Sequence, residues 1–524
     1  MRPPSNETPR RASPDDVDTA LLEVDGDLEE LGDPEGRPAT PSSTLAVHTA
    51  LAGRTRSQRL SATGAGEPEQ LIRLALPVML TMGLATMGNM VDRAMIGWLD
   101  GGAGAAEALA GAAYATQFFA LIQSTLFAIG LSCVAVMARS IGAGSAEQAR
   151  GALVASLQIA LTVTVILTGL FLAFARQGLH ALGATPNVIA TALPYLYCLL
   201  SSSVLLAYAL VIDSALRADQ NTLTPMRVAV GVSVVKLAGN AVLIYGLFGL
   251  PALGLTGAGL ATLLSQVVGV LLFAGAVRRQ PEASPVRIRR ADWREARHLR
   301  PTLVRIALPG VAERLVMSGA QMGFFAILGH YYGTVAVAVY AVGVPLLSFT
   351  WIPGTSYAQA AATLVGHALG ANDPARAIRT GWIAATLALG TAVLVGVPVA
   401  LGRETLASLF TGDPQVIAEL GPFLLVLAAA QPFLQLHFTL GGAHRGAGDT
   451  WTPLLAATAS NGLRLALAAT AAMLLDLPVT YVWGAIFADH FFRALLLLIA
   501  YQRGHWIRNA AKNMPVSKDL GQTG

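Results

Sequence analysis

The sequence predicts an all-α membrane protein of twelve transmembrane helices, arranged as two six-helix lobes related by a pseudo-two-fold axis along the membrane normal. Of its 524 residues, 54% are hydrophobic and 13% are charged, about half the charged fraction of a soluble protein. The mean hydropathy is +0.56. The apolar residues gather in segments of about 20–28 residues, which can cross a hydrocarbon core of about 30 Å. The segments of the second half also repeat those of the first.

Residues 1–66 differ from the rest of the chain and predict a disordered cytoplasmic tail. Stretches such as MRPPSNETPRRASPDDVDT and EVDGDLEELGDPEGRP are rich in Pro, Gly, Asp and Glu. Segments of this composition bury too little apolar surface to offset the entropy lost on ordering. The tail has no secretory signal pattern, and its acidity is untypical of an organelle transit peptide.

Twelve apolar segments follow, and each is expected to be a helix because backbone groups in lipid must be hydrogen-bonded within the segment. The expected spans of the amino-terminal lobe, residues 67–277, are 71–99, 108–137, 150–175, 187–216, 224–247 and 255–277. Those of the carboxy-terminal lobe, residues 303–505, are 303–331, 335–364, 376–401, 416–441, 452–475 and 479–502. We expect residues 278–302 to be a basic cytoplasmic linker and residues 506–524 a second cytoplasmic tail.

The basic residues predict which ends of the spans face the cytoplasm, because short cytoplasmic loops are enriched in Lys and Arg. The linker carries Arg278, Arg279, Arg287, Arg289, Arg290, Arg294, Arg297 and Arg300. The loops at the opposite end are poorer, since 100–107 has no base and 248–254 has no charge. We therefore expect a multi-pass plasma (inner) membrane protein with both termini inside. This asymmetry explains the net charge of +4 without any nucleic-acid partner.

An internal repeat predicts the two lobes. LPYLYCLLSSSVLLAYALVIDSALRADQNTLTP aligns without a gap to GPFLLVLAAAQPFLQLHFTLGGAHRGAGDTWTP at an offset of 228 residues, which also pairs Gly142 with Gly370. LIRLALP matches LVRIALP at an offset of 232. Because six spans per repeat is an even number, both halves have the same orientation, and the substrate site is expected between them.

Several function classes are excluded by what the chain lacks. Cys133 and Cys198 both lie inside apolar spans and are expected to be packing residues, so that neither a disulfide nor a metal site is predicted. The sequence has no G-x-x-x-x-G-K-[ST] loop for ATP-driven pumping. It also has no converging set of His, acid, Ser or Lys residues for a membrane enzyme. No cofactor is expected.

Charged side chains inside the spans are the best candidates for the functional site. Lys236 lies in the apolar run GVSVVKLAGNAVLIYG, where a lone ammonium costs about 2.5–3.5 kcal/mol. Asp92 is the acid well inside the first span, and Asn240 follows Lys236 by one helical turn on the same face. We expect an Asp92–Lys236 pair, which either takes part in ion coupling or only fixes the two helices together.

The other intramembrane charges are open to two interpretations each. The offset of 228 pairs Lys236 with Arg464. No acid occupies the position of the second lobe that corresponds to Asp92. We therefore expect either that the second lobe is electropositive or that backbone carbonyls and water hydrogen-bond to Arg464. Glu313 and Arg314, in the inner half of the seventh span, form either an inner gate or inter-lobe contact or a buried local pair.

Shorter signals concern polar side chains near the helix ends. Asp213 and Arg217 are four residues apart at the inner end of the fourth span, which predicts a salt bridge at the helix end. Asp489 and Arg493 repeat this spacing and are given the same interpretation. Asn89, on the helical face of Asp92, is a candidate for the pocket. His330 and His437 are interpreted as lone, packed histidines.

Four stretches resemble a known family, the multidrug and toxic compound extrusion (MATE) transporters. They are LALPVMLTMGLATMGNMVDRAMIGWL, MARSIGAGSAEQAR, LFGLPALGLTGAGLATLLSQ and HRGAGDTWTPLLAATASN. The resemblance spans residues 70–505. It implies a two-lobed bundle of twelve helices that alternates access and expels organic, often cationic, compounds against an inward flow of protons or sodium.

The resemblance also implies a cation site in the amino-terminal lobe, at positions matched here by Asp92, Lys236, Asn240 and Thr262. This chain departs from the family pattern, because a lysine stands where the fifth helix has an asparagine and an asparagine stands where it has an acid. The departure favours protons over sodium as the coupling ion. We expect the lysine to replace the bound cation of related proteins.

The expected function is secondary antiport, in which a monomer in the lipid bilayer exports organic, cationic or amphiphilic compounds in exchange for protons. The alternatives are a sodium-coupled drug antiporter and a flippase for lipid-linked saccharide precursors. A flippase built on a similar bundle would usually have fourteen spans and several cationic residues facing its central cavity.

Overall fold

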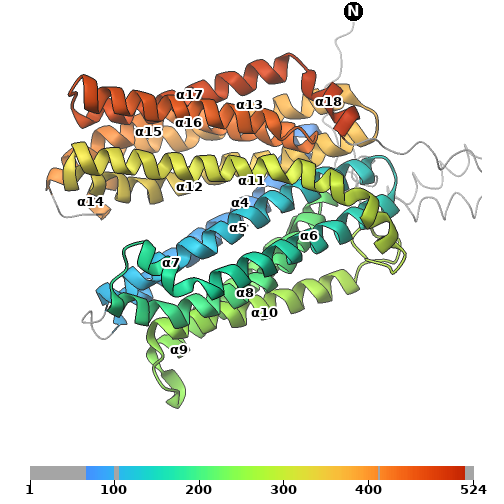
Figure 1. Cartoon of the computed structure of the whole chain (residues 1–524). Helices are drawn as coiled ribbons and strands as arrows, with labels where there is room; N and C mark the ends of the chain where they lie inside the picture. The colour runs from blue at the N-terminus through green and yellow to red at the C-terminus, as the bar shows by residue number, and fades with distance from the viewer. Residues whose placement is uncertain (1–65, 100–104, 411–413, 514–524) are drawn as a thin grey trace, which may run out of the picture. The chain divides into compact units, whose positions relative to one another are not determined.

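The computed structural model describes residues 66–99, 105–410 and 414–513, which form helices joined by short turns without any strand. The acidic tail at 1–65 and residues 514–524 lie outside the described residues. The first half contains α4 (Glu67–Gly97), α5 (Ala105–Gly142), α6 (Ala146–Ala173), α7 (Ala175–Ala181), α8 (Pro186–Ala218), α9 (Leu223–Tyr245), the 3₁₀ turn η2 (Leu247–Gly249) and α10 (Gly254–Arg278). Figure 1 traces this half in blue to green.

The second half repeats the order of the first. It contains α11 (Asp292–Tyr331), α12 (Gly333–Gly370), α13 (Pro374–Leu401), α14 (Arg403–Phe410), α15 (Pro414–Gly446), α16 (Trp451–Ala469), the π-helical turn η3 (Thr470–Leu474), α17 (Val479–Gln502) and α18 (His505–Asn513). Each expected span falls on one of the twelve long helices in the described ranges. Ten of these helices are long and apolar enough to cross a membrane; α12 and α16 occupy the places of the other two expected spans.

Two segments differ from the expectation. Helix α11 begins at Asp292 rather than at residue 303, so the second part of the basic linker is helical. The Asp292 carboxylate explains this start, because it accepts a hydrogen bond from the backbone N–H of Arg289 at 2.6 Å and pairs with Arg150 of α6 at 3.1 Å. Residues 505–513, which include the start of the expected second tail, form a short helix, α18.

Equivalent capping residues start equivalent helices in the two halves. The Ser145 side chain accepts a hydrogen bond from the backbone N–H of Gln148 at the start of α6. Asp373, 228 residues later, does the same for Arg376 at the start of α13. A side-chain oxygen at this position satisfies an N–H group that has no partner inside the helix. The repeat in sequence is therefore a repeat in local hydrogen bonding.

Helices α5 and α12 meet across the axis that relates the two halves. Their close approach depends on glycines, because a Cβ on Gly142 would overlap the carbonyl oxygen of His367 and a Cβ on Gly370 would overlap that of Arg139. Gly142 and Gly370 are equivalent in the repeat. A contact in which equivalent patches face each other is what a two-fold axis produces.

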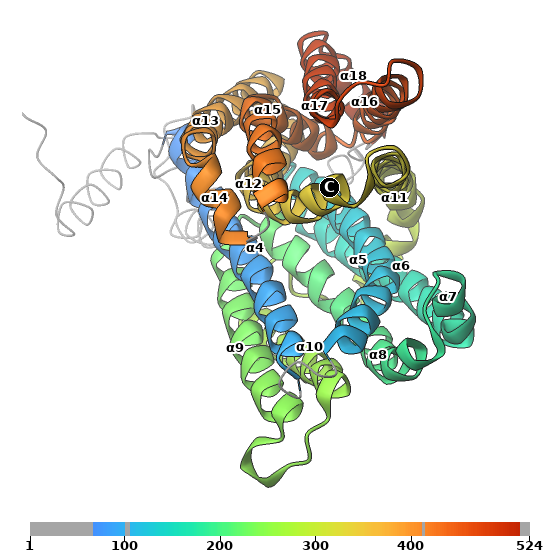
Figure 2. The same ribbon diagram turned by 90° about the vertical axis from the view of Figure 1, so that its left-hand side faces the viewer.

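Helix α4 packs against both halves. It contacts α9 of its own half and α12 of the other, and Figure 2 shows it in blue beside the green α9. Leu71 and Leu74 of α4 form a buried cluster with Tyr357 of α12 and Ala384 of α13. A displacement of α4 relative to α9 would therefore also change the packing of α4 against α12 and α13.

Candidate substrate and ion-coupling site

Asp92 of α4 is held by two side chains of α9. The Lys236 ammonium contacts its Oδ2 atom, and the Asn240 Nδ2 group donates to its Oδ1 atom at 2.6 Å. Lys236 and Asn240 lie one turn apart on the same helical face, which allows both to reach one carboxylate. The structure thus brings together three of the residues that the sequence singled out.

This pair is partly buried. The Asp92 and Lys236 side chains are 16% and 22% exposed, and Asn240 is fully buried. A charge in such surroundings requires a counter-charge or hydrogen bonds. The Lys236 ammonium neutralises the Asp92 carboxylate, and the carboxylate neutralises the ammonium. Removal of either side chain leaves the other charge without its counter-charge.

Thr262 and Asn89 take no part in the pair. The Thr262 hydroxyl group of α10 donates instead to the carbonyl oxygen of Ala258 in its own helix, at 3.0 Å. Asn89 is exposed on α4, one turn before Asp92. Of the four positions that the family resemblance implies, Asp92, Lys236 and Asn240 are in contact with one another, and Thr262 is not.

Asp213 and Arg217 form the expected i, i+4 salt bridge in α8, at 2.9 Å. Arg217 also extends beyond its own lobe, because its Nη1 group donates to the Oε1 atom of Gln359 in α12. Two turns further along α12, the His367 Nε2 atom lies 2.7 Å from the carbonyl oxygen of Ala218, the residue after Arg217. Asp213 therefore positions an arginine that joins the two halves.

Glu313 and Arg314 do not form a local pair. The Glu313 carboxylate accepts from Arg445 of α15 at 2.6 Å, an ion pair that the sequence analysis did not predict. The Arg314 guanidinium lies over the ring of Phe127 in α5, 4.7 Å from its centroid. Arg314 thus makes the inter-lobe contact that was one of the two interpretations, and Glu313 holds α11 against α15.

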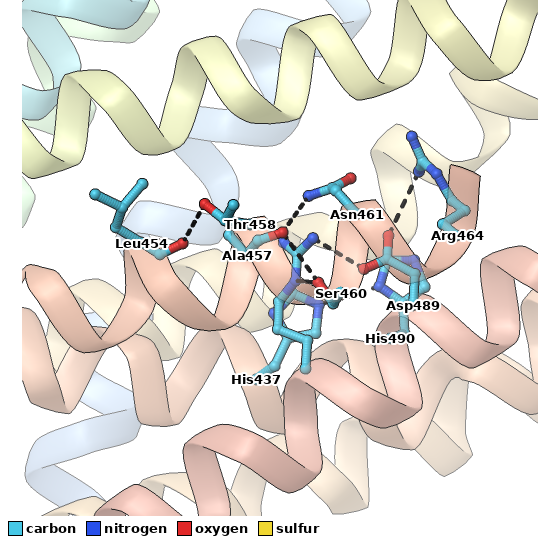
Figure 3. A network of polar contacts seen from close by, with 10 residues as sticks. His437, Leu454, Ala457, Thr458, Ser460, Asn461, Arg464, Asp489 and His490 are labelled. Carbon is cyan, nitrogen blue, oxygen red and sulfur yellow. Dashed lines mark hydrogen bonds and ion pairs between the residues drawn. The ribbon is translucent and has the colours of Figure 1, made fainter. Parts of the chain in front are cut away.

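The expectation that Arg464 has no acidic partner is wrong. Asp489 of α17 lies 3.4 Å from the Arg464 Nη1 group, although it is not at the position that corresponds to Asp92. Asp489 also pairs with Arg493 at 2.9 Å, and Arg493 in turn donates to the Ser460 hydroxyl group. Figure 3 shows this network between α16 and α17.

Two further expectations about this region are corrected. The Asp489–Arg493 pair lies in the middle of α17 and is buried, rather than at a helix end. His437 is not a lone histidine, because its Nε2 atom lies 3.2 Å from the Nδ1 atom of His490 and the two rings are stacked (Figure 3). His490 directly follows Asp489 on α17. The sequence could not place His437 beside them, because this contact depends on the packing of α15 against α17.

Two adjoining cavities border these residues. One is lined by α11, α12, α15, α16 and α17 together with Phe127 and Leu131 of α5, and therefore lies where the halves meet. The other lies among helices of the second half and is lined by Arg464, Trp351 and His490 among others. They share the lining residues Met317, His437, Phe438 and Arg493. A compound at the junction of the halves would therefore touch both.

A sequence profile of the family described as MatE matches residues 77–242 and 309–470, one stretch in each half and together more than half of the chain. The chain belongs to the MATE family. Its members are transporters, so this MATE chain is a multi-pass membrane transporter of small molecules and not an enzyme.

Curated relatives and solved structures agree with the family. The chain is 29% identical over 461 residues to the probable multidrug resistance protein NorM of Thermotoga maritima, covering 86% of this chain and 96% of the relative. It is 32% identical to the protein of the same name from Bradyrhizobium diazoefficiens, covering 74% and 82%. A structure of a multidrug resistance MATE transporter, described as outward-facing, matches with a TM-score of 0.78 at 22% identity over 86% of this chain and 97% of that one. The last comparison shows the shared fold.

Proposed function

We propose that this chain is a secondary active antiporter that exports organic, cationic or amphiphilic compounds in exchange for protons. The observation that supports the proposal is the contact of the Lys236 ammonium with the Asp92 carboxylate, between α4 and α9. In this proposal no cofactor is needed, and the lysine takes the place that a mobile cation has in related proteins.

The pair can couple proton movement to export without a metal ion. In this scheme a cationic group that reaches Asp92 from inside displaces Lys236 from the carboxylate, and one proton leaves the site inward. When the compound leaves outward, Lys236 takes a proton from outside and pairs with Asp92 again. One proton thus enters for each positive charge that leaves. Protonation of Asp92 itself would give the same exchange.

The two halves supply the movement that such exchange needs. In this proposal the ends of the helices that carry the basic loops face the cytoplasm, with both termini inside the plasma (inner) membrane. At those ends α5 and α8 meet α12, through Arg217–Gln359 and through the paired glycines Gly142 and Gly370. The arrangement is closed toward the cytoplasm, and export requires these contacts to separate. We propose a monomer, because each chain contains both halves.

The test is dye export by purified protein in proteoliposomes under an imposed proton or sodium gradient. With ethidium as the probe, we expect transport to follow the proton gradient and to fall by at least about tenfold in Asp92→Asn and in Lys236→Gln, since each leaves an uncompensated group in the membrane. The control is Arg403→Gln, because the Arg403 and Glu404 side chains on α14 are 40% and 84% exposed. Transport by this control should equal that of the wild type.

Two outcomes would overturn the proposal. Export that follows the sodium gradient and ignores the proton gradient would point to a sodium-coupled drug antiporter. The other alternative is a flippase for lipid-linked saccharide precursors, favoured by the arginines that border the cavities, Arg314, Arg445, Arg464 and Arg493. Lipid-linked saccharide transfer with no uphill movement of ethidium in either gradient would support that function instead.

A further inference from the structure

The two halves treat equivalent basic residues differently. Lys236 corresponds to Arg464 at the offset of 228, and Asp92 corresponds to Phe324 at the offset of 232 that applies to the first helix of each half. Where the first half has an ion pair, the second half therefore has a guanidinium over an aromatic ring, 5.2 Å from its centroid. A cation–π contact of this kind compensates a charge less fully than a carboxylate does.

The acid that Arg464 does contact is shared. Asp489 pairs with Arg493 at 2.9 Å and lies at 3.4 Å from Arg464. A separation of 3.4 Å is long for a charge-assisted hydrogen bond, which is typically about 2.7–2.9 Å. Two guanidinium groups thus share one carboxylate, and one positive charge remains without an equivalent negative charge.

The charges around both cavities add to this excess. Their lining includes four arginines, Arg314, Arg445, Arg464 and Arg493, and two acids, Glu313 and Asp489. Glu313 forms an ion pair with Arg445, and Arg314 makes a cation–π contact with Phe127. In the described part of the chain the cavities are therefore more positive than negative. Buried charges normally occur in pairs, so this excess indicates a negatively charged group that is not part of the chain.

Two of the side chains that line this cavity carry buried donors without a partner. Among the described residues, the Nε and Nη2 groups of Arg464 and the Nε1 group of Trp351 are buried without any hydrogen-bond partner. Both side chains line the cavity within the second half. All three groups are donors, which favours an acceptor-rich ligand in this cavity. Each buried donor without a partner carries a substantial desolvation cost, which makes such a ligand favourable.

The cavity has room for a small anionic group. It measures about 70 Å³, whereas one water needs about 10–15 Å³ on the same measure. Its other walls include Leu434, Phe438 and Ile486, and it adjoins the inter-lobe cavity at Met317 and Phe438. An acidic head group could lie by Arg464 while an apolar body extends toward the other half.

We propose that the cavity beside Arg464 and Trp351 binds the anionic group of an amphiphilic organic acid, a carboxylate, sulfonate or phosphate, carried by the exported compound. The proposal rests on the function proposed above and extends its substrates to compounds that also carry an acid. The two lobes then differ in sign: the Asp92 site accepts a positive group, and the Arg464 site accepts a negative one.

Equilibrium binding without any ion gradient tests this proposal separately from transport. The probes are 1-pyrenebutyrate and the neutral 1-pyrenebutyramide, which share one apolar body, and binding is followed by pyrene fluorescence with the full chain in nanodiscs. We expect the carboxylate to bind about 10- to 100-fold more tightly than the amide, the range for hydrogen bonds to charged groups. Arg464→Met should abolish this preference, and Arg464→Lys should retain part of it.

A second variant keeps the proposal falsifiable if Arg464→Met does not fold. Asp489→Asn removes the carboxylate that competes for Arg464, so it should bind 1-pyrenebutyrate more tightly than the wild type, a gain that misfolding cannot produce. Asp92→Asn should leave the preference unchanged while it impairs proton-driven export. Equal binding of the two probes by the wild type, or weaker carboxylate binding in Asp489→Asn, would overturn the anionic subsite and leave the antiport proposal standing.

Discussion

Asp92 receives one hydrogen bond from a buried amide and one contact from an ammonium, and both come from a single face of α9. Because the three groups contact one another, the changes in unfolding free energy caused by mutating them should be coupled rather than additive. The Nδ2 group of Asn240 serves the carboxylate, whereas its Oδ1 atom is buried without a partner among the described residues. Asn240 therefore holds the Asp92 carboxylate with one of its two polar groups.

The stability of single and double variants tests this coupling. Asp92→Asn or Lys236→Gln alone should lower the free energy of unfolding by about 3–5 kcal/mol, because each leaves a buried charge without its partner. The double variant should recover a large part of that loss. Thermal unfolding in detergent, compared across the four proteins, measures the interaction. Additive losses would show that the two side chains do not depend on each other.

A second residue-scale feature is Asp449, in the turn between α15 and α16. It accepts from the Thr452 backbone and hydroxyl groups at 3.2 and 2.7 Å and from His444 at 3.0 Å. Burial acts to raise the pKa of Asp449, but the hydrogen bond and charge of His444 and the bonds from Thr452 outweigh it, so that the pKa lies below its ordinary value of 3.8.

This pKa gives a pH dependence with a definite sign. Because the folded pKa lies below the unfolded one, the stabilisation by Asp449 is present above pH 3.8 and is lost as pH falls below that value. Asp449→Ala should cost about 0.5–2 kcal/mol at neutral pH through loss of the cap. Its difference from the wild type should shrink on acidification, as measured by unfolding curves at several pH values. A difference that grows toward acid pH would contradict the assignment.

At the scale of elements, the contact of α5 with α12 determines whether the basic ends of the two halves can close. Ala138 and Gly366 meet there as Gly142 and Gly370 do, and both pairs are equivalent in the repeat. Because small residues allow helix backbones to approach closely in membranes, a larger side chain should act as a wedge between the halves.

Gly142→Leu should therefore shift the molecule toward a state that is open at the basic end. Spin labels at Glu147 and Ala375, exposed and equivalent in the two halves, report this by pulsed distance measurements. The distance distribution should move to longer values than in the wild type. Leu at Gly169, which has open space around it, is the matched control and should leave the distribution unchanged. An unchanged distribution in Gly142→Leu would mean that the two helices separate by another route.

At the scale of the whole molecule, the direction of insertion determines which way the exchange runs. The eight arginines at 278–300 and the charge-free residues 248–254 lie at opposite ends of the helices. Cysteine labelling in intact cells tests the orientation. Phe248→Cys, at a position that is 92% exposed, should react with an impermeant reagent in intact cells, and Arg290→Cys only after the membrane is opened. The reverse pattern would invert the proposed direction of transport.

The repeat made the helix order and the two halves predictable, and the high cost of a lone charge in lipid made the Asp92–Lys236 contact predictable. The partners of Glu313 and Arg464 were not predictable. Arg445 and Asp489 come from helices more than 100 and about 25 residues away, respectively, and no local spacing brings them together.

The amino-acid sequence by itself determined that this chain crosses the membrane in twelve helices of two equivalent sets, since apolar length and the repeat are local properties of the chain. Only the tertiary structure decided which charges neutralise one another, because in a membrane the partner of a buried charge is the nearest group in space, on whichever helix packs there. It left Arg464, the counterpart of Lys236, on an aromatic ring with a carboxylate that Arg493 also holds.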